Sequence, residues 1–537
     1  MYGLSRVLSG RIFVATLVAQ RQSSPAIVHG SVYSYGGWFH IVPYLLRAYP
    51  ARAYNYHTVS ALVYARGLAC IIISMPRQKS KRRQRIHLTF VYTLMVVAVV
   101  SIVTVLVLVI QGYRYNRFDG RLEQGGLVQF NSKPSGAVVT VDDVTLSNKT
   151  ASKVTLTSGR HTITMARDGY SSWRKDVLVK PGGVLWLNYA RLFPNTPQID
   201  SVAQFSQVSS TLPSPSKRLI AVVGAATSPE VSLVDIDSDK PVVRKVAIPA
   251  ASYTAPEEGQ VQSFALINWD KDSNLLLVKH TYGDKSEYLS LDTRNATATN
   301  ITTELGVDIA SIDYSLGDSN VLYALTTTHE LRRLNLGSAT VSGPLALGVS
   351  SFNVAENRVI AYETLPDSKG MRSVGYVSSG SNVSKPIASY HLANDAPLRV
   401  VTGNYYGDHY VAVLRGELVE ILKGDLPSSD SSSKIDLESV ASLMIAGGGD
   451  YLGFAPGANR MIYVASDKRV VTYDLELRTN ATITLQTPLV RDVQWLDGYH
   501  ILATGPNSYY YDYDGTNGQL FASNTLDLPA ALSSSEK

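Results

Sequence analysis

An uncharged apolar run near the amino end constrains this chain more than any other feature. Residues 88–110 read LTFVYTLMVVAVVSIVTVLVLVI and contain no charged side chain. An α-helix rises about 1.5 Å per residue, so this run can cross a hydrocarbon core of about 30 Å. A buried helix of a soluble protein normally keeps a polar face, and a cleaved signal peptide has an apolar region of only about 7–15 residues. We therefore predict an uncleaved transmembrane helix over residues 87–111.

The basic residues before this run predict its orientation. Six cationic side chains precede it, and the segment after it is mixed and weakly charged; the six are Arg77, Lys79, Lys81, Arg82, Arg83 and Arg85. Lys and Arg are enriched on the cytoplasmic side of membrane spans. We expect residues 75–86 to be a basic cytoplasmic segment, which could also hold anionic lipid, and the chain beyond Gly112 to lie outside the cytoplasm.

The net charge of the chain combines a basic amino-terminal part with a weakly acidic remainder. Residues 1–85 hold twelve of the 49 basic residues and none of the 44 acidic ones, which leaves 37 basic and 44 acidic residues, a net charge of −7, after position 85. No basic stripe follows the span, so we predict no nucleic-acid partner. The single cysteine, Cys70, precedes the span, so the outer part must be stabilised by packing rather than by disulfides.

The first 74 residues are unlike the rest of the chain. They contain no Asp, Glu or Lys and show no sustained helical or strand period, whereas Met75 opens a sequence typical of a membrane-anchored protein. We interpret residues 1–74 as an unfolded extension from upstream translation. The alternative is an additional interfacial or membrane segment, because residues 61–73 are fairly apolar, although Arg66 interrupts them.

The segment that follows the span predicts a stalk and then a small β domain. Residues 112–126 are polar and hold three glycines, which argues against a longer helix and predicts a stalk. Beyond it, segments rich in Val, Thr, Ile and aromatic residues alternate with Gly- and Pro-containing turns; these segments are 127–131, 137–142, 160–167, 172–180 and 184–192. Short strands between turn residues predict an all-β domain over residues 127–194.

Motifs within this stretch resemble the PEGA domain, a family named for a Pro-Glu-Gly-Ala turn. They are Pro134-Ser135-Gly136-Ala137, Val139-Thr140-Val141-Asp142, Leu156-Thr157-Ser158-Gly159-Arg160-His161 and Asp168-Gly169-Tyr170. Ser135 replaces the usual Glu, and Asp143 stands where a glycine often follows the aspartate. The resemblance implies a compact β-sandwich of bacterial and archaeal surface proteins that serves as a binding or spacer module, without catalysis.

Individual residues of these motifs have predicted structural roles. Gly136 and Gly169 suit turn positions with positive φ, and Pro134 fixes φ at the entry to its turn. Tyr170 and Trp173 are expected to pack in the core or between sheets. In residues 160–167 strand alternation places Ile163 and Met165 on one side together with His161, which we interpret as a structural histidine rather than a metal ligand. The structural motif residues are Pro134, Gly136, Ala137, Val141, Asp142, Gly159, His161, Gly169 and Tyr170.

The large remainder of the chain contains a repeat. Short apolar strand cores recur roughly every 40–55 residues, each after a polar turn in most cases; the cores are 219–223, 275–278, 321–325, 359–362, 410–414, 461–464 and 500–503. Many are followed by a second strand of shared pattern, as at 231–236, 288–292, 331–336, 470–475 and 509–513. We predict a β-propeller of about seven blades over residues 201–526, with six or eight blades possible and a frayed tail at 527–537; an array of β-sandwiches is the competing fold. The unit resembles WD40-like propellers only loosely.

The sequence shows no pattern of catalysis or cofactor binding. It has no His-Glu-x-x-His, Cys-x-x-Cys, P-loop or Gly-x-Ser-x-Gly motif, and its outer histidines are scattered. The segment Asp512–Gly518 looks like a calcium loop, but Ser523 stands where a bidentate Glu is required, so we interpret it as a turn between strands. We predict no catalytic residue, metal ligand or cofactor.

These observations favour a single-pass protein of the cell envelope whose outer part serves, without catalysis, in surface binding, adhesion or scaffolding toward a protein or glycan partner. Two alternatives remain open. One is an envelope enzyme acting on glycan from the central channel of the propeller, which would need converging carboxylates or a histidine there. The other is an envelope sensor or assembly factor, although only about a dozen residues would remain inside the cell if residues 1–74 are discounted.

Overall fold

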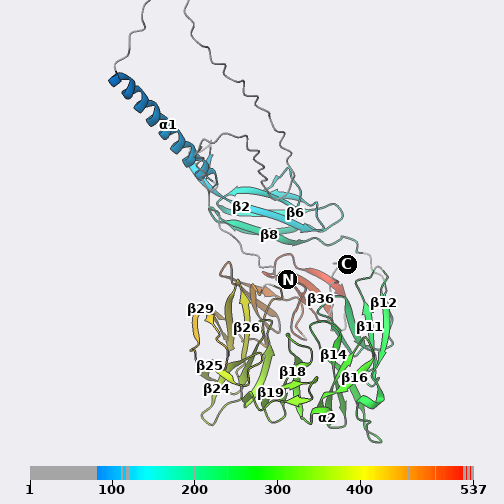
Figure 1. The fold of residues 1–537 in the computed structure, drawn as a ribbon. Helices are drawn as coiled ribbons and strands as arrows, with labels where there is room; N and C mark the ends of the chain where they lie inside the picture. The colour runs from blue at the N-terminus through cyan, green and yellow to red at the C-terminus, as the bar shows by residue number, and fades with distance from the viewer. Residues whose placement is uncertain are drawn as a thin grey trace, which may run out of the picture. The chain divides into compact units, whose positions relative to one another are not determined.

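The apolar run forms one long helix. The computed structural model describes residues 81–110, 113–116, 121–197, 201–238, 240–457, 459–489 and 491–523, together with 528 and 533. Helix α1 (Lys81–Ile110) begins within the basic segment, since Lys, Arg and Gln favour helix, and ends where the apolar run ends (Figure 1). The predicted extension over residues 1–74, as well as Arg77 and Lys79, lies outside the described residues.

The first β domain is a sandwich of two four-stranded sheets. In one sheet β2 (Arg121–Lys133) is central; it pairs antiparallel with β1 (Tyr113–Asn116) and β5 (Ser152–Thr157) and parallel with β8 (Val184–Arg191). The other sheet has the antiparallel order β4 (Val144–Thr145), β3 (Val138–Val141), β6 (Gly159–Ala166) and β7 (Trp173–Val179). The predicted strands are present, whereas β4 and β5 were not predicted.

The predicted stalk over residues 112–126 is corrected by the structure. Strand β1 and the first part of β2 lie within it and pair with each other from Tyr113 to Gln124. Two of its glycines serve close packing rather than flexibility. A Cβ atom at Gly125 would lie 2.4 Å from the Leu156 carbonyl oxygen, and one at Gly126 would lie 2.6 Å from the Lys180 carbonyl oxygen. The glycines therefore admit neighbouring backbone to the middle of a strand, a role that sequence alone does not distinguish from a flexible linker.

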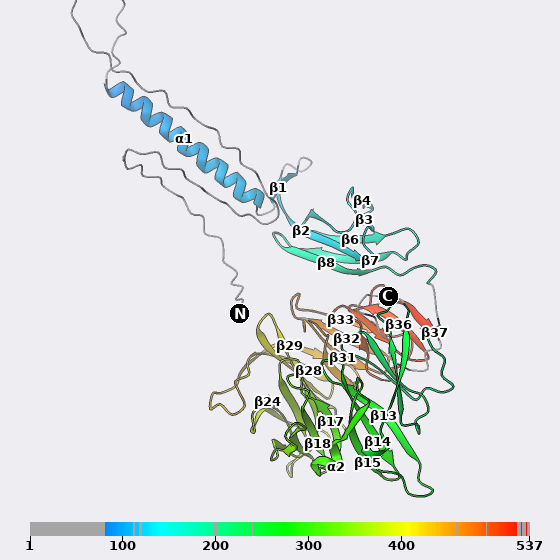
Figure 2. The same cartoon turned by 45° about the vertical axis from the view of Figure 1, so that its right-hand side comes forward.

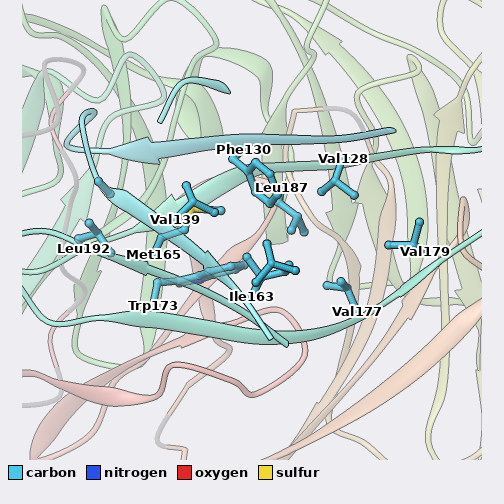
Figure 3. Packing of buried hydrophobic residues seen from close by; sticks show 13 residues of the cluster. Val128, Phe130, Val139, Ile163, Met165, Trp173, Val177, Val179, Leu187 and Leu192 are labelled. Carbon is cyan, nitrogen blue, oxygen red and sulfur yellow. The ribbon is translucent and has the colours of Figure 1, made fainter. Parts of the chain in front are cut away.

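The core of this domain follows strand alternation. In β6, Ile163 and Met165 are fully buried, as predicted, and in β7 every second residue from Trp173 to Val179 is buried. Figure 3 shows these side chains meeting Phe130 and Leu187 from the opposite sheet. One face of each sheet thus packs on the other, which is the architecture of a β-sandwich.

The rest of the chain is a β-propeller built from consecutive antiparallel sheets. Among the described residues, seven sheets of four or five strands follow one another between Ser210 and Ser523, and Figure 2 shows them succeeding each other from green to red. The first sheet contains β9 (Ser210–Pro213), β10 (Leu219–Val223), β11 (Glu230–Asp235) and β12 (Val242–Ala247); the second contains β13 (Gln262–Trp269), β14 (Leu275–Tyr282), β15 (Lys285–Asp292) and β16 (Thr297–Asn300). The third contains β17 (Ile309–Tyr314), β18 (Val321–Thr326), β19 (Glu330–Asn335), β20 (Thr340–Val341) and β21 (Ala346–Leu347); the fourth contains β22 (Val349–Val354), β23 (Val359–Thr364), β24 (Met371–Ser378) and β25 (Ser384–His391). The fifth contains β26 (Leu398–Tyr405), β27 (Asp408–Arg415), β28 (Leu418–Asp425) and β29 (Asp436–Met444); the sixth contains β30 (Tyr451–Phe454), β31 (Met461–Ser466), β32 (Arg469–Asp474) and β33 (Thr479–Thr484); the seventh contains β34 (Gln494–Trp495), β35 (His500–Ala503), β36 (Asn507–Asp512) and β37 (Gln519–Ser523).

Apolar side chains between neighbouring sheets hold the propeller together. The apolar cores recognised in the sequence are the second strands of the sheets, and the repeated second pattern is the third strand. Each main apolar cluster is shared by two successive sheets; one, for example, joins Val223 and Leu233 of the first sheet to Leu276 and Leu289 of the second. A single sheet has two apolar faces, so it is stable only when neighbours cover both of them.

Polar turns add a second set of contacts between sheets. The Ser216 backbone amide donates to Ser273 Oγ of the second sheet, and Ser319 Oγ of the third sheet donates to Asp270 Oδ2 of the second. Lys217 Nζ donates to the Leu496 carbonyl oxygen, which links the turn before the first sheet's second strand to the seventh sheet. The first and last sheets therefore contact each other, and each is built from its own consecutive strands.

Candidate functional site

Helix α1 carries the features expected of a membrane span. Residues Arg85–Ile110 are long and apolar enough to cross a bilayer, and none of their most apolar part is buried against other described residues. The hydroxyl groups of Thr93 and Thr104 donate to the backbone carbonyls of Thr89 and Val100, one helical turn earlier. These bonds satisfy the two hydroxyls within the helix, as a solvent without hydrogen-bonding groups requires.

Four of the six positively charged residues that predicted the orientation lie at the start of this helix. Lys81, Arg82, Arg83 and Arg85 belong to its first turns, ahead of the apolar part, and the side chains of Arg82 and Arg85 are exposed. The cationic group is therefore continuous with the helix rather than separated from it by a loop.

The turn around Pro134 is fixed by one threonine. Thr150 accepts from the Gly136 amide through its carbonyl oxygen and from the Ala137 amide through Oγ1, and its hydroxyl contacts Ser132 Oγ at 2.6 Å. Ser132 Oγ in turn donates to the Pro134 carbonyl oxygen. Gly136 has φ of 85°, as predicted for this turn. The motif Pro134-Ser135-Gly136-Ala137 thus positions the start of β3.

The second motif forms a two-residue hairpin turn. Val141 and Val144 pair across it, and Asp142 and Asp143 have φ of 48° and 66°. Positive φ at both central residues is typical of a type I′ turn, in which Asp-Gly is preferred, so the glycine usual at position 143 has a clear physical reason. Asp143 adopts the same conformation without that freedom.

Asp142 also connects this turn to β6. Its Oδ1 accepts from the Thr162 amide, and its Oδ2 lies 2.6 Å from His161 Nδ1, while His161 Nε2 lies 2.9 Å from the Thr157 carbonyl oxygen. The hydrogen bond from the Thr162 amide, followed by that from His161, lowers the pKa of Asp142. Both ring nitrogens of His161 therefore have protein partners. Gly159, which precedes this histidine, has φ of 142°.

The fourth motif, Asp168-Gly169-Tyr170, lies at the end of the domain that leads to the propeller. Gly169 has φ of 82°, as predicted, and its carbonyl oxygen accepts from the Asn195 amide. Tyr170 packs against the sandwich core and bridges to Pro194. The motif residues are thus distributed over separate turns, each with a structural partner, and the structure does not bring them together into one site.

The best-developed polar site in the chain joins the sandwich to the last propeller sheet. Trp173 is buried in the sandwich core (Figure 3). Its Nε1 nevertheless donates to Asp512 Oδ2 at 2.8 Å. The next residues continue the contact: the Arg174 amide donates to Asn517 Oδ1, and Lys175 Nζ lies 2.8 Å from Asp514 Oδ2. The loop Asp512–Gly518, interpreted from the sequence as a turn, does join β36 to β37, and it is also the docking loop for the first domain.

A stack of aromatic rings forms the other half of this interface. Tyr189 of β8 stacks on Tyr499 with a centroid distance of 4.5 Å and contacts Tyr513 edge-on, while Phe193 packs edge-on against Tyr510. Lys175 Nζ lies 4.4 Å from the centroid of the Tyr513 ring. Aromatic pairs add about 0.5–1.5 kcal/mol each beyond their buried area, so these contacts stabilise one arrangement of the two domains.

Burial and charge set the ionisation of the interface carboxyl groups. Burial raises the pKa of Asp512, and the charges of His500 and Lys175, together with the donors from Asn517 and Trp173, only partly oppose that rise. For Asp514, burial favours the neutral form, but the ammonium group of Lys175 outweighs it and lowers the pKa. Burial also opposes ionisation of Asp497, but the hydrogen bond from His500 and its charge lower the pKa of Asp497 to about 2.

Three further carboxyl groups are buried inside the propeller and are separate from one another. Burial raises the pKa of Asp313 to about 6, that of Glu363 to about 7 and that of Asp492 to about 6. Each has its own partner: Asn268 donates to Asp313, Ser351 to Glu363, and Tyr463 to Asp492. Within the described ranges, no group of three or more His, Cys, Asp or Glu residues is placed to hold a metal ion.

Sequence reasoning missed the interface, although one signal for it was present. Alternation in β7 places Lys175 on the same buried face as Trp173 and Val177. A lysine on the apolar face of a strand requires a partner carboxylate, which predicts a contact outside the domain. That partner is Asp514, which lies more than 300 residues away along the chain, so the local sequence does not identify it.

Comparison with known proteins identifies the first β domain and finds similar solved structures for part of the chain. Residues 126–192 match the family model described as PEGA domain, whereas a search of curated proteins finds no match to the chain. Among solved structures, the chain is similar to the C-terminal WD40 domain of Sif2, with 12% identity over 60% of this chain and 87% of that chain and a TM-score of 0.39. It is also similar to the β-propeller domain of Cps50 (Swd1) from Myceliophteria thermophila, with 8% identity over 59% and 96% of the two chains and a TM-score of 0.38. The chain joins an apolar helix and a PEGA domain at residues 126–192 to the β-propeller seen in its sheet topology.

Proposed function

We propose that this chain is a single-pass protein of the cell envelope, with its amino end in the cytoplasm and its PEGA domain and propeller outside as a non-catalytic binding or scaffold region. The observation that carries this proposal is helix α1, whose apolar part is not buried against other described residues. Strand β1 follows the helix after only two residues. Exposure of so much apolar surface to water costs about 25 cal/mol per Å², whereas a bilayer removes that cost.

The interface between the PEGA domain and the propeller supports a scaffold role. Hydrogen bonds from Trp173 and Arg174, the Lys175–Asp514 ion pair and the ring stack of Tyr189 on Tyr499 fix one domain on the other. The propeller is thus linked to the PEGA domain by side-chain contacts as well as by the connecting chain. Such a region presents its loops to a partner at a low cost in conformational entropy.

Cysteine labelling tests the topology. In a Cys70→Ser background, single cysteines replace Ser147 in the PEGA domain, Ser432 in the propeller and Ser80 before the span; Ser147 and Ser432 are exposed. A membrane-impermeant maleimide should label the first two in intact cells and the third only after lysis. Labelling of the Ser80 position in intact cells, with protection of the other two, would contradict the proposed orientation.

The mass of the membrane-extracted protein distinguishes an anchor from a cleaved signal sequence. An anchor retains residues 88–110, and the protein stays with the membrane after washing with high salt or alkali. A mature protein that begins after Ile110 and is released by washing would show that the helix is a removable signal.

A capture experiment tests the binding role. The full chain and a matched chain that ends at residue 197, and so lacks the propeller, are used to capture partners from intact envelopes after chemical crosslinking. We expect a partner that is enriched by the full chain alone. Equal recovery by both chains would contradict a role for the propeller.

A further inference from the structure

An arginine occupies the same position in three propeller sheets, directly before the second strand. Arg218 precedes β10, Arg358 precedes β23 and Arg460 precedes β31. In the first sheet the first residue of this strand pairs with Asp235 on the third strand, and in the sixth sheet with Asp474. These aspartates bind their arginines: Arg218 Nη2 lies 2.9 Å from Asp235 Oδ2, and Arg460 Nη2 lies 2.6 Å from Asp474 Oδ2.

The fourth sheet lacks this counter-ion. The residue that pairs with the first position of β23 is Ser378, whose Oγ accepts from the Ser429 amide. Arg358 is exposed, and its guanidinium has no hydrogen-bond or ion-pair partner among the described residues. The neighbouring third sheet lacks the acid as well, because Asn335 stands where the second sheet has Asp292.

These two sheets enclose a cleft of about 430 Å³ on the side of the propeller that carries these turns. Its charged and amide-bearing walls are formed by Arg333, Arg358, Asn335 and Asp318, so two cations face one carboxylate. Arg333 donates to the Ser381 carbonyl oxygen and to Asn382 Oδ1, neither of which is charged. The cleft therefore has a net positive lining.

A second cleft, between the first and second sheets, provides an internal comparison. It has a similar volume, about 460 Å³, and its charged lining is Arg218, Arg244, Asp235 and Asp272. Two cations there face two carboxylates, and Asp235 directly binds Arg218 through Nε and Nη2. Each cleft lies between two successive sheets, and the two have a similar size but a different balance of charge. Arg218 comes from the earlier sheet of its pair, whereas Arg358 comes from the later one.

A buried tyrosine adds a second observation at the positive cleft. Tyr323 lines it and is 1% exposed, yet its Oη has no hydrogen-bond partner in the described part of the chain. A buried hydroxyl without a partner costs about 1–3 kcal/mol, which a hydrogen bond to a bound group would offset.

We propose that the cleft between the third and fourth sheets binds the carboxylate or phosphate group of a small polar ligand. Arginine is suited to both groups because its planar guanidinium donates two parallel hydrogen bonds, and the amide of Asn335 supplies a neutral donor. This inference rests on the proposed binding role and names the chemistry that one of its sites recognises.

The test uses the full chain in detergent and ligand-observed NMR titrations with inorganic phosphate, glucuronate and, as an uncharged control, glucose. We expect phosphate or glucuronate to bind and glucose not to bind. Arg358→Ala should weaken anion binding about tenfold or more, as expected for loss of a charged hydrogen-bonding group. The matched variant Arg218→Ala should bind as the wild type does, because that position is already neutralised by Asp235.

A second variant places an acid in the cleft, at the position where the second sheet has Asp292 and the third sheet has Asn335. Asn335→Asp keeps the shape of the side chain but adds a carboxylate to the cleft, so it should also weaken anion binding about tenfold while the thermal midpoint of unfolding stays near that of the wild type. Binding of phosphate alone assigns a phosphate ligand, and binding of glucuronate alone assigns a carboxylate. Failure of both anions to bind, or equal binding by the wild type and Arg358→Ala, would overturn the proposal. Neither result would affect the topology, which the cysteine labelling tests separately.

Discussion

The first and last propeller sheets use the same aspartate position for different purposes. In the first sheet Asp235 binds Arg218 at the surface, where 64% of the arginine side chain is exposed. In the last sheet the equivalent Asp512 is fully buried and accepts from Trp173 of the PEGA domain and from Asn517. One position in a repeated fold thus serves a surface ion pair in one sheet and domain docking in another, and the surrounding burial decides how much it contributes to stability.

Trp173→Ala should have the largest effect, because it affects both the sandwich core and the interface. Loss of a buried Trp typically costs about 3–5 kcal/mol. Trp173→Phe keeps most of the core and removes only the hydrogen bond to Asp512, so it should cost less. Urea unfolding of the full chain measures both variants, and equal costs would show that the interface bond, not the core, dominates.

Asp512→Ala and Asp235→Ala compare the two sheets directly. The first leaves the buried indole of Trp173 without an acceptor and should cost about 2–3 kcal/mol, whereas the second removes an exposed ion pair and should cost less than about 1 kcal/mol. Thermal unfolding under identical conditions provides the measurement. An equal loss of stability in the two variants would contradict our inference that the buried Asp512 contributes more than the partly exposed Asp235.

Glu363 and Asp497 should respond to pH in opposite ways. The pKa of Glu363 is raised to about 7, so folding favours its neutral form; its contribution is fully present below about pH 4.5 and is lost as the pH rises to about 7. The pKa of Asp497 is lowered to about 2, so its contribution is present above about pH 4 and is lost as the pH falls toward 2. The Glu363 difference corresponds to at most about 3 kcal/mol.

Glu363→Gln tests this sign. The variant should be more stable than the wild type at pH 8, and this advantage should shrink or reverse at pH 5, as measured by urea midpoints at the two values. A Glu363→Gln advantage that is larger at pH 5 than at pH 8 would contradict the assigned direction.

Asp143→Gly should have the smallest effect and the opposite sign to the interface variants. Asp143 has φ of 66° in a turn that prefers glycine, so the substitution should stabilise the PEGA domain by about 0.5–1 kcal/mol. Differential scanning calorimetry measures the change, with Asp143→Ala as a control that keeps the strain. Destabilisation by glycine would mean that the carboxylate of Asp143 makes a contribution beyond the turn.

The local features of the molecule could be predicted from sequence, and the long-range ones could not. The helix, the positive φ of Gly136 and Gly169, and the buried face of β6 follow from short sequence patterns that depend on neighbouring residues. The same reasoning failed at Gly125 and Gly126, because backbone that comes from elsewhere in the chain, not the local sequence, requires glycine there.

The two candidate sites depend on partners that only the fold brings together. Trp173 and Asp512 are far apart in the chain, and nothing local to either residue identifies the other. Arg358 is visible in the sequence, but its lack of a counter-ion becomes clear only when strand register aligns Ser378 with Asp235 and Asp474. When the propeller sheets are aligned by strand register, differences in charge between equivalent positions become visible. The sequence pattern alone does not show these differences.

Limited proteolysis of intact, wall-stripped cells tests the central claim most directly. If the apolar helix anchors an outer PEGA domain and propeller, added protease should cut the chain before lysis and release a stable fragment that begins between residues 111 and 121, in the segment around β1, while the basic amino-terminal segment stays protected. A propeller that resists protease in intact cells but is digested as soon as the cells are opened would contradict both the orientation and the proposed function.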